Sequence, residues 1–451
     1  MTTLLERLGL NRPELRAWAL YDWANSAFWT TIVAAVFPIY FTRVAASELP
    51  PAVATARFAA ATTFAMVLIA LLSPVLGAMA DYAGLKMKML GAFTGLGVLA
   101  TGAMYFIGRG DWELALVLFV LGNIGVTGSL VFYESLLPHV AREEERDMVA
   151  SAGFALGYLG GGLLLSVNLL CIQKPALFGI ADEATASRLS FLSVAVWWLG
   201  FSIPLFRRVR EPERRIEPER RIEPERRIEK DETGEEKLLS VAFTRLGETF
   251  RELRTYRQAF LMLAAFLIYN DGIVTIIRMA TSYGTEVGLD RGVLISGLLI
   301  TQVVGIPFAF LFGWLSKRIT AKRAILLSLA VYVGISVVGY RMKTASDFYL
   351  LAILVGMVQG GSQALSRSLF STLIPAHKSA EFFAFFGVFD KFAGIFGPAL
   401  FAVTIMMTGS SRNAVLSVIG FFVVGAILLS LLNVEEGRKV ARAAEAELES
   451  A

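Results

Sequence analysis

The chain has 451 residues, of which 55% are hydrophobic and only 18% are charged. Soluble domains carry about 25% charged residues, so this composition excludes an ordinary soluble protein and indicates an integral membrane protein. The single cysteine, Cys171, excludes an internal disulfide, and a net charge of +4 spread over connecting segments gives no reason to expect a nucleic-acid partner.

Twelve apolar runs are each about 20 residues or longer, enough to cross a bilayer as a helix. The first run is too long for a signal peptide and lacks a clear cleavage site, so we expect it to be retained as a spanning helix. The runs cover approximately 17–41, 56–80, 88–108, 112–137, 148–172, 188–206, 258–280, 292–316, 322–341, 347–374, 380–407 and 413–433.

A charged segment, 207–256, separates the first six runs from the last six. Its centre contains three copies of Glu-Pro-Glu-Arg-Arg-Ile between Glu211 and Ile228. Proline prevents a continuous helix and the balanced charge keeps the segment in water, which predicts a flexible linker; contact with anionic lipid heads is the alternative. The predicted domains are an N-terminal bundle (1–206), the linker (207–256), a C-terminal bundle (257–434) and a tail (435–451).

Lysine and arginine are enriched in the termini, the linker and alternate loops. Positively charged loops stay inside, so both termini and the linker are predicted to be cytoplasmic. We expect the protein in a bacterial inner membrane, surrounded by lipid and as a monomer.

The two halves of the chain repeat. Gly77 and Gly313 begin similar loops, and Pro138 and Pro375 follow the fourth run of each half at almost the same spacing. Six helices duplicated in this way predict an all-α membrane protein: twelve transmembrane helices in two six-helix bundles related by a pseudo-twofold axis, the major facilitator fold.

The loop after the second run resembles the signature of the major facilitator superfamily at that place. Its matching residues are Gly77, Asp81, Gly84, Lys86 and Lys88. The resemblance implies that they act as a gate during the conformational cycle. Asp81→Asn is then expected to slow turnover more than it weakens binding.

Five further stretches resemble a narrower branch, the autophagy-related vacuolar amino-acid effluxers of fungi and their bacterial relatives. They are Ala19–Phe28, Gly153–Gly161, Trp197–Pro204, Tyr269–Gly272 and Gly360–Ser368. The resemblance implies solute transport and, more weakly, amino-acid efflux. Glu134 departs from the asparagine that the resemblance leads us to expect, so no family role is carried to it.

In this architecture the first, fourth, seventh and tenth helices line a central cavity, so their polar residues are the candidates for substrate binding or coupling. An acid inside a spanning helix costs about 2.5–3.5 kcal/mol on insertion scales and is functional by default. The alternatives are a brace or a structural ion pair, and for Glu134, near the helix end, a structural role is favoured. The candidates are Asp22, Asn25, Asn270, Asp271, Arg278, Gln359, Gln363 and Arg367, with Asp390 and Lys391 on the eleventh helix.

Two of the candidates are predicted to lie at the same depth. Asp22 and Arg367 are each about eight residues from the cytoplasmic end of their helices, which is about 12 Å at 1.5 Å per residue. They belong to opposite halves, so a contact between them could open and close as the bundles move.

The sequence therefore predicts a secondary active transporter that moves a small polar solute by alternating access. A zwitterion such as an amino acid fits a cavity with acids and an arginine, and a carboxylate could carry a coupling proton. The alternative is a sensor or assembly partner that keeps the fold without transport. Catalytic motifs, cofactor loops and metal-ligand spacings are not recognisable, so we expect no enzyme activity, cofactor or metal.

Overall fold

A computed structural model describes residues 4–50, parts of 53–80, 84–211, 251, 253–393, 396–408 and 410–450. Its regular elements in these ranges are all helical. In the first half they are α1 (Leu4–Arg7), α2 (Pro13–Ala27), η1 (Phe28–Ala35), α3 (Val36–Tyr40), η2 (Phe41–Ala45), α5 (Lys86–Ala103), η3 (Met104–Phe106), α6 (Trp112–Ser135), α7 (Leu137–Val140), α8 (Arg146–Gln173), η4 (Pro175–Phe178) and α9 (Glu183–Arg208). In the second half they are α12 (Arg257–Glu286), α13 (Arg291–Ile319), α14 (Ala321–Arg341), α15 (Ala345–Ser371), η5 (Ala376–Lys378), α16 (Ser379–Phe392), α17 (Phe396–Thr408), α18 (Ser411–Ser417), α19 (Ile419–Leu431) and α20 (Val434–Ser450).

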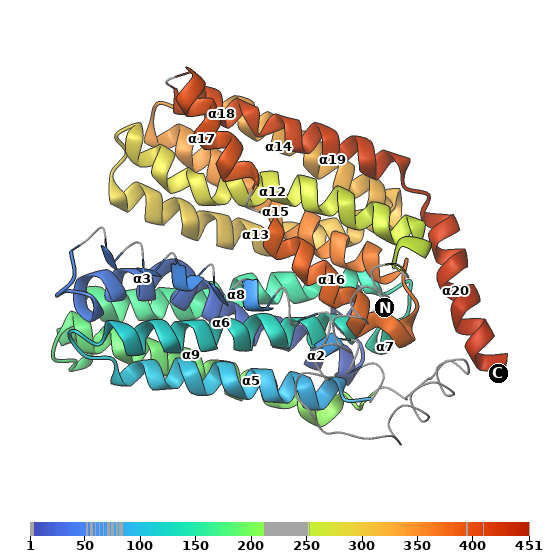
Figure 1. The fold of residues 1–451 in the computed structure, drawn as a ribbon, viewed down its shortest axis with the longest axis horizontal. Helices are drawn as coiled ribbons and strands as arrows, with labels where there is room; N and C mark the ends of the chain where they lie inside the picture. The colour runs from blue at the N-terminus through green and yellow to red at the C-terminus, as the bar shows by residue number, and fades with distance from the viewer. Residues whose placement is uncertain are drawn as a thin grey trace, which may run out of the picture.

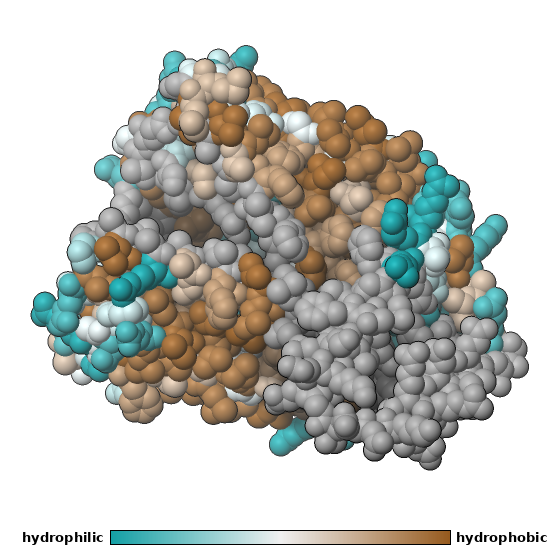
Figure 2. All heavy atoms as spheres, viewed as in Figure 1, coloured by the Kyte–Doolittle hydropathy of each residue, from teal (hydrophilic) through white to brown (hydrophobic). Residues whose placement is uncertain are grey.

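Within the described residues, ten helices are long and apolar enough to cross a membrane. Two of the predicted runs account for the difference from twelve. The described residues of run 56–80 are helical, but positions outside the described part separate them, and run 380–407 is divided into α16 and α17, with an extended backbone at Ala393. On the face shown in Figure 2, hydrophobic residues cover the middle of the molecule and hydrophilic residues gather toward its two ends, as expected for a protein that spans a bilayer.

The first long helix is not regular. Pro13 stands in its first turn, where a missing backbone N–H costs nothing. From Phe28 to Ala35 the chain continues as a π-helix, and the stretch Pro13–Ala45 counts as one spanning segment. Wider turns of this kind are frequent at functional sites because they re-aim side chains.

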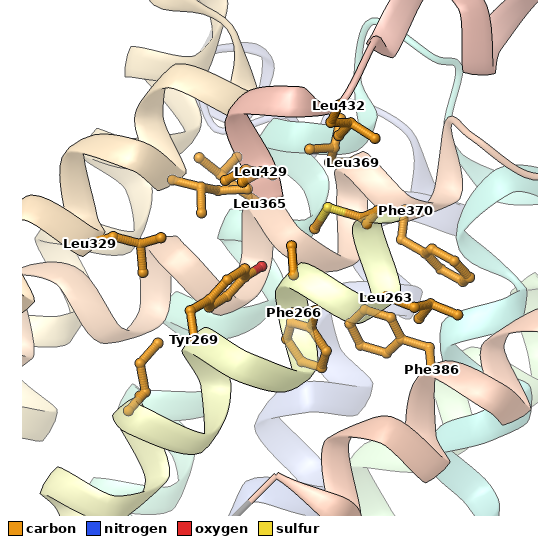
Figure 3. Packing of buried hydrophobic residues seen from close by; sticks show 14 of the residues in the cluster. Leu263, Phe266, Tyr269, Leu329, Leu365, Leu369, Phe370, Phe386, Leu429 and Leu432 are labelled. Carbon is orange, nitrogen blue, oxygen red and sulfur yellow. The ribbon is translucent and has the colours of Figure 1, made fainter. Parts of the chain in front are cut away.

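The helices pack as two groups (Figure 1). Helices α2, α5, α6, α8 and α9 lie together on one side, and α12 to α19 lie together on the other. The second group is built on a large aromatic and aliphatic core, in which Phe266 stacks on Phe386 with ring centroids 4.3 Å apart (Figure 3). Both chain termini lie at one end of the helices, here named the terminal end.

Two glycines that the repeat relates make equivalent contacts across the two groups. A Cβ atom placed on Gly77 would lie 2.9 Å from the Cβ of Ala384, and one placed on Gly313 would lie 3.2 Å from the Sδ of Met148. Ala384 and Met148 are separated by the same number of residues as the two glycines. The sequence repeat is therefore matched by a repeat in packing, as a pseudo-twofold axis requires.

The C-terminal helix α20 reaches from the second group to the first. Glu143, in the loop before α8, accepts from Arg442 at 2.6 Å and pairs with Arg438 at 3.0 Å. The Glu445 carboxylate accepts a hydrogen bond from the Ala376 N–H. The predicted tail is thus a helix that bridges the two groups at the terminal end.

The linker repeats from residue 212 onward lie outside the described residues, but their first residue is described. Glu211 accepts a hydrogen bond from the Met87 N–H at the start of α5, at 2.8 Å. Burial is the main effect on this carboxyl group and raises its pKa above the ordinary value. The prediction that the whole repeat stands apart from the bundles is therefore wrong for Glu211.

Deleting residues 212–228 should leave transport and the melting temperature of the purified protein nearly unchanged, because the charged repeat is predicted to remain in water. Glu211→Ala should instead cost about 1 kcal/mol, since it leaves the Met87 N–H without its partner. Thermal unfolding measures the stability of each variant, and uptake into vesicles measures its transport. Loss of transport in the deletion variant at normal expression would reveal a specific lipid or protein contact of the repeat.

Candidate functional site

A cavity of about 1800 Å³ lies between the two groups of helices. Its wall includes Asp22 and Arg367 deep in the protein and continues to Arg43, Glu183 and Phe348, which lie toward the helix ends away from the termini. Figure 2 shows the surface hollowed between the two groups on that side. The cavity is therefore open at the end opposite to the terminal end.

Polar contacts between the two groups close the terminal end. The Lys86 Nζ lies 2.8 Å from the Ser379 Oγ, and the Ser368 hydroxyl donates to Asp147 at 2.6 Å. These contacts lie between the cavity floor and the terminal end, so they close the described cavity at that end.

The floor of the cavity is built around Arg367, on α15. Its Nη1 lies 3.3 Å from the Asp22 Oδ2 on α2, and its Nη2 lies 2.9 Å from the Glu134 Oε1 on α6. Asp22 and Arg367 are each only 6% exposed. The structure thus contains the contact predicted between Asp22 and Arg367, and it adds a second carboxylate from the first group.

Glycines on α8 allow α2 to bring Asp22 into this position. A Cβ on Gly153 would lie 2.6 Å from the Asp22 Oδ2, and one on Gly157 would lie 2.6 Å from the Ser26 Oγ. Side chains at these two positions would push α2 away. The glycine-rich stretch of α8 therefore positions the acid through close helix packing.

Aromatic rings surround the guanidinium group. The Arg367 Cζ lies 4.7 Å from the ring centroid of Phe154, 5.7 Å from that of Tyr133 and 5.9 Å from that of Trp18. Trp18 is held by a hydrogen bond from its Nε1 to the Tyr133 carbonyl at 3.0 Å. The rings keep water from the ion pairs and add cation–π attraction, which strengthens the electrostatic interactions at the floor.

The remaining predicted site residues divide into those in the cavity wall and those behind it. Asn25, Gln359, Gln363 and Asp390 line the cavity. Asn270 and Asp271 are not among the described wall residues.

Those two side chains bond within the second group instead. The Asn270 Nδ2 donates to Asp390 at 2.9 Å, and the Asp271 carboxylate accepts from the Gly397 N–H at 3.0 Å. The side chains of Arg278 and Lys391 lie outside the described part of the chain. The roles of Arg278 and Lys391 in substrate binding or coupling therefore stay predictions.

Four of the predicted gate residues are described, and they lie at the terminal end: Gly77, Gly84, Lys86 and Lys88. Gly77 touches α16, and Gly84 has a left-handed backbone with φ of 63°, which favours glycine. Lys86 is buried and contacts Ser379, whereas Lys88 is exposed. Asp81 lies outside the described residues, so the expectation for Asp81→Asn stays a prediction.

Several polar wall residues are not among the site residues predicted from the sequence, and three of them matter most for the site: Glu134, Tyr158 and Gln302. The sequence favours a structural role for Glu134 near a helix end, but its carboxylate contacts Arg367. Tyr158 and Gln302 also line the cavity. Tyr158 lies in the glycine-rich stretch of α8, one turn after Phe154. A polar aromatic residue among glycines that allow close helix packing was the sequence signal that could have identified it.

Comparison with known proteins gives consistent results. The family described as "Vacuole effluxer Atg22 like" matches residues 52–442. The uncharacterized MFS-type transporter YxiO of Bacillus subtilis is 38% identical over 94% of this chain and 96% of its own length. Autophagy-related protein 22-1 of Aspergillus niger is 26% identical over 66% of this chain, and the match spans only 49% of that longer protein.

Solved structures of major facilitator transporters share the fold. The proton:xylose symporter XylE superimposes with a TM-score of 0.68 over 93% of this chain and 95% of its own, at 14% identity. The fucose:proton symporter FucP of E. coli gives a TM-score of 0.66 over 93% of this chain and 98% of its own, also at 14% identity. Both helix groups and the cavity between them thus have the expected architecture, and the chain belongs to the Atg22-like family of major facilitator transporters.

Proposed function

We propose that the protein is a secondary active transporter for a small zwitterionic solute of the amino-acid class and that it is coupled to protons. One observation carries the proposal: the buried contact of Arg367 with Asp22 joins the two helix groups at the floor of an open cavity. Arginine binds carboxylates in a fixed geometry, and a cavity-facing carboxylate can take up a proton.

The contact gives a physical reason for coupling. The terminal end can open only if the two groups separate, which would move Arg367 away from both Asp22 and Glu134. A buried charge without a partner costs several kcal/mol, so separation requires substitute partners. The substrate carboxylate can replace the two acids at Arg367, while a proton on Asp22 and the substrate ammonium beside Glu134 compensate the two carboxylates. Solute and proton would then move in the same direction.

We further propose that the terminal end is cytoplasmic, following the predicted charge distribution, and that the cavity faces the outside of a bacterial inner membrane. The bundles 1–206 and 257–434 would rock about the cavity, while 207–256 would connect them as a linker. No catalytic step is required of any residue in this scheme.

A screen in proteoliposomes tests the proposal. Purified protein is reconstituted, and uptake of labelled amino acids is measured with acid or alkaline buffer outside and with Arg367→Gln as the inactive control. We expect uptake that an outside-acid gradient stimulates. Stimulation by an outside-alkaline gradient would overturn the shared direction, and the absence of any amino-acid flux, with stable ligand binding, would favour a sensor.

A further inference from the structure

Tyr158 connects the two helix groups in the wall of the cavity. It belongs to α8, but its ring fits against two glycines of the second group. A Cβ on Gly305 would lie 3.0 Å from ring atoms of Tyr158, and one on Gly360 would lie 2.5 Å from them. The two glycines therefore form a notch that the aromatic ring fills.

The hydroxyl group of Tyr158 makes no hydrogen bond within the described part of the chain, although the residue lines the cavity. The side-chain amides of Gln302, Gln359 and Gln363 also line the cavity and make none with the described residues. Polar groups in such a wall stay bound to water until a ligand with matching groups replaces it. These four residues are named the amide subsite.

The amide subsite lies one to two helical turns from Arg367 toward the open end. Phe154 contacts the guanidinium, and Tyr158 follows it by one turn on α8. On α15, Gln363 and Gln359 precede Arg367 by one and two turns. One turn is about 5.4 Å, so the groups of the amide subsite closest to Arg367 lie about this far along the helices from its position.

The second helix group places Gln302 beside the same region. Gln302 is on α13 one turn before Gly305, and a Cβ on Gly162 of α8 would lie 3.8 Å from the Gln302 Cβ. Groups from α8, α13 and α15 thus converge, and Tyr158 belongs to one bundle while the three glutamines belong to the other. A ligand that bonded to both would be held across the interface that moves.

We propose that the amide subsite binds the side chain of a zwitterionic amino acid whose side chain ends in an uncharged amide, with glutamine as the best match in length. This inference rests on the proposed function, which assigns the carboxylate to Arg367. Four carbon–carbon bonds join the two ends of glutamine and span about 5 Å, close to one helical turn.

The chemistry of the subsite also argues against different kinds of side chain. An apolar side chain would leave Tyr158 and the glutamines without water or a partner, which costs more than a lost contact. A charged side chain would lose its hydration in exchange for neutral groups only. Leucine, glutamate and lysine should therefore bind more weakly than glutamine.

The test is equilibrium binding of labelled glutamine to the purified full-length protein, with leucine, glutamate and lysine as competitors. Tyr158→Phe keeps the ring in its notch and removes only the hydroxyl. We expect it to weaken glutamine binding about tenfold and to leave leucine binding unchanged. Gln363→Leu should act in the same way, and Tyr340→Phe, on a partly exposed residue of α14, is the matched control.

Two results would overturn the inference. One is equal binding of glutamine by Tyr158→Phe and the unchanged protein; the second is an equal loss of glutamine and leucine binding, which would make the tyrosine a packing residue. The proposed function fails separately. If leucine or a charged amino acid is bound best and Arg367→Gln abolishes that binding, the amide assignment is wrong while amino-acid transport stands; if Arg367→Gln binds amino acids normally, the carboxylate assignment is wrong.

Discussion

Replacing Asp22 by Asn or Arg367 by Gln should each abolish transport, and the second change should destabilise the protein more. Asp22→Asn leaves Arg367 in contact with Glu134 at 2.9 Å, whereas Arg367→Gln removes the cation that both Asp22 and Glu134 contact. Removing one partner of a buried ion pair typically costs about 3–5 kcal/mol. The melting temperature in detergent and solute counterflow in vesicles measure the two effects.

The combined variants test whether the three residues act as a unit. The double variant Asp22→Asn with Arg367→Gln should recover part of the lost stability, and adding Glu134→Gln should recover most of it, because no uncompensated charge then remains from the triad. Transport should stay absent in both. Strictly additive losses would show that Asp22 and Arg367 contribute independently, one as a proton carrier and the other as a carboxylate clamp.

The architecture could be predicted because the apolar runs that indicate it are long and the two halves of the sequence repeat. Apolar runs of about 20 residues are rare outside membrane-spanning helices, and the nearly equal spacings between Gly77 and Gly313 and between Pro138 and Pro375 indicated the two halves. The fold class and the family are confirmed by the structural and sequence comparisons. Hydropathy alone does not locate the end of α16 at Phe392, because run 380–407 stays apolar through the extended backbone at Ala393.

The candidate site was predictable only where depth could be counted along a helix. Counting residues from the helix ends predicted that Asp22 and Arg367 lie at the same depth. In the structure the Asp22 Oδ2 and the Arg367 Nη1 are 3.3 Å apart. Direction around the helix is harder to infer. Asn270 and Asp271 are adjacent in sequence, so they point to different sides of α12, and both form bonds within their own group.

Glu134 shows a second limit of sequence reasoning. Its distance from Pro138 suggested that it could reach water at the helix end, and nothing in the chain indicated that Arg367 would lie closer. A contact between residues so distant in the sequence depends on how the two bundles meet, and the hydrophobic periodicity of the separate helices carries no information about that.

Replacing Gly77 by Val should hold the terminal end open and stop transport. A Cβ there would lie 2.5 Å from the Ala380 carbonyl oxygen and 2.9 Å from the Ala384 Cβ, and a backbone atom of a packed helix cannot move aside cheaply. Gly313→Val should act in the same direction but more weakly. Its nearest neighbours are the side chains of Ser151 and Met148, which can rearrange.

Cysteine labelling measures this shift in a Cys171→Ser background. A cysteine at Ser371, whose carbonyl accepts from Arg146 at the closed end, should become more reactive, and one at Ser187 in the cavity wall should become less reactive.

The control is Gly334→Val, because no atom lies within 4 Å of a Cβ at that position and the closed end should be undisturbed. If Gly77→Val raised labelling at both reporter positions, the glycine would be stabilising the fold generally. If it raised labelling only at Ser371, the terminal end would depend on the close approach of Gly77 to α16 in order to close. Glycine would then be required at this position because any side chain prevents that approach.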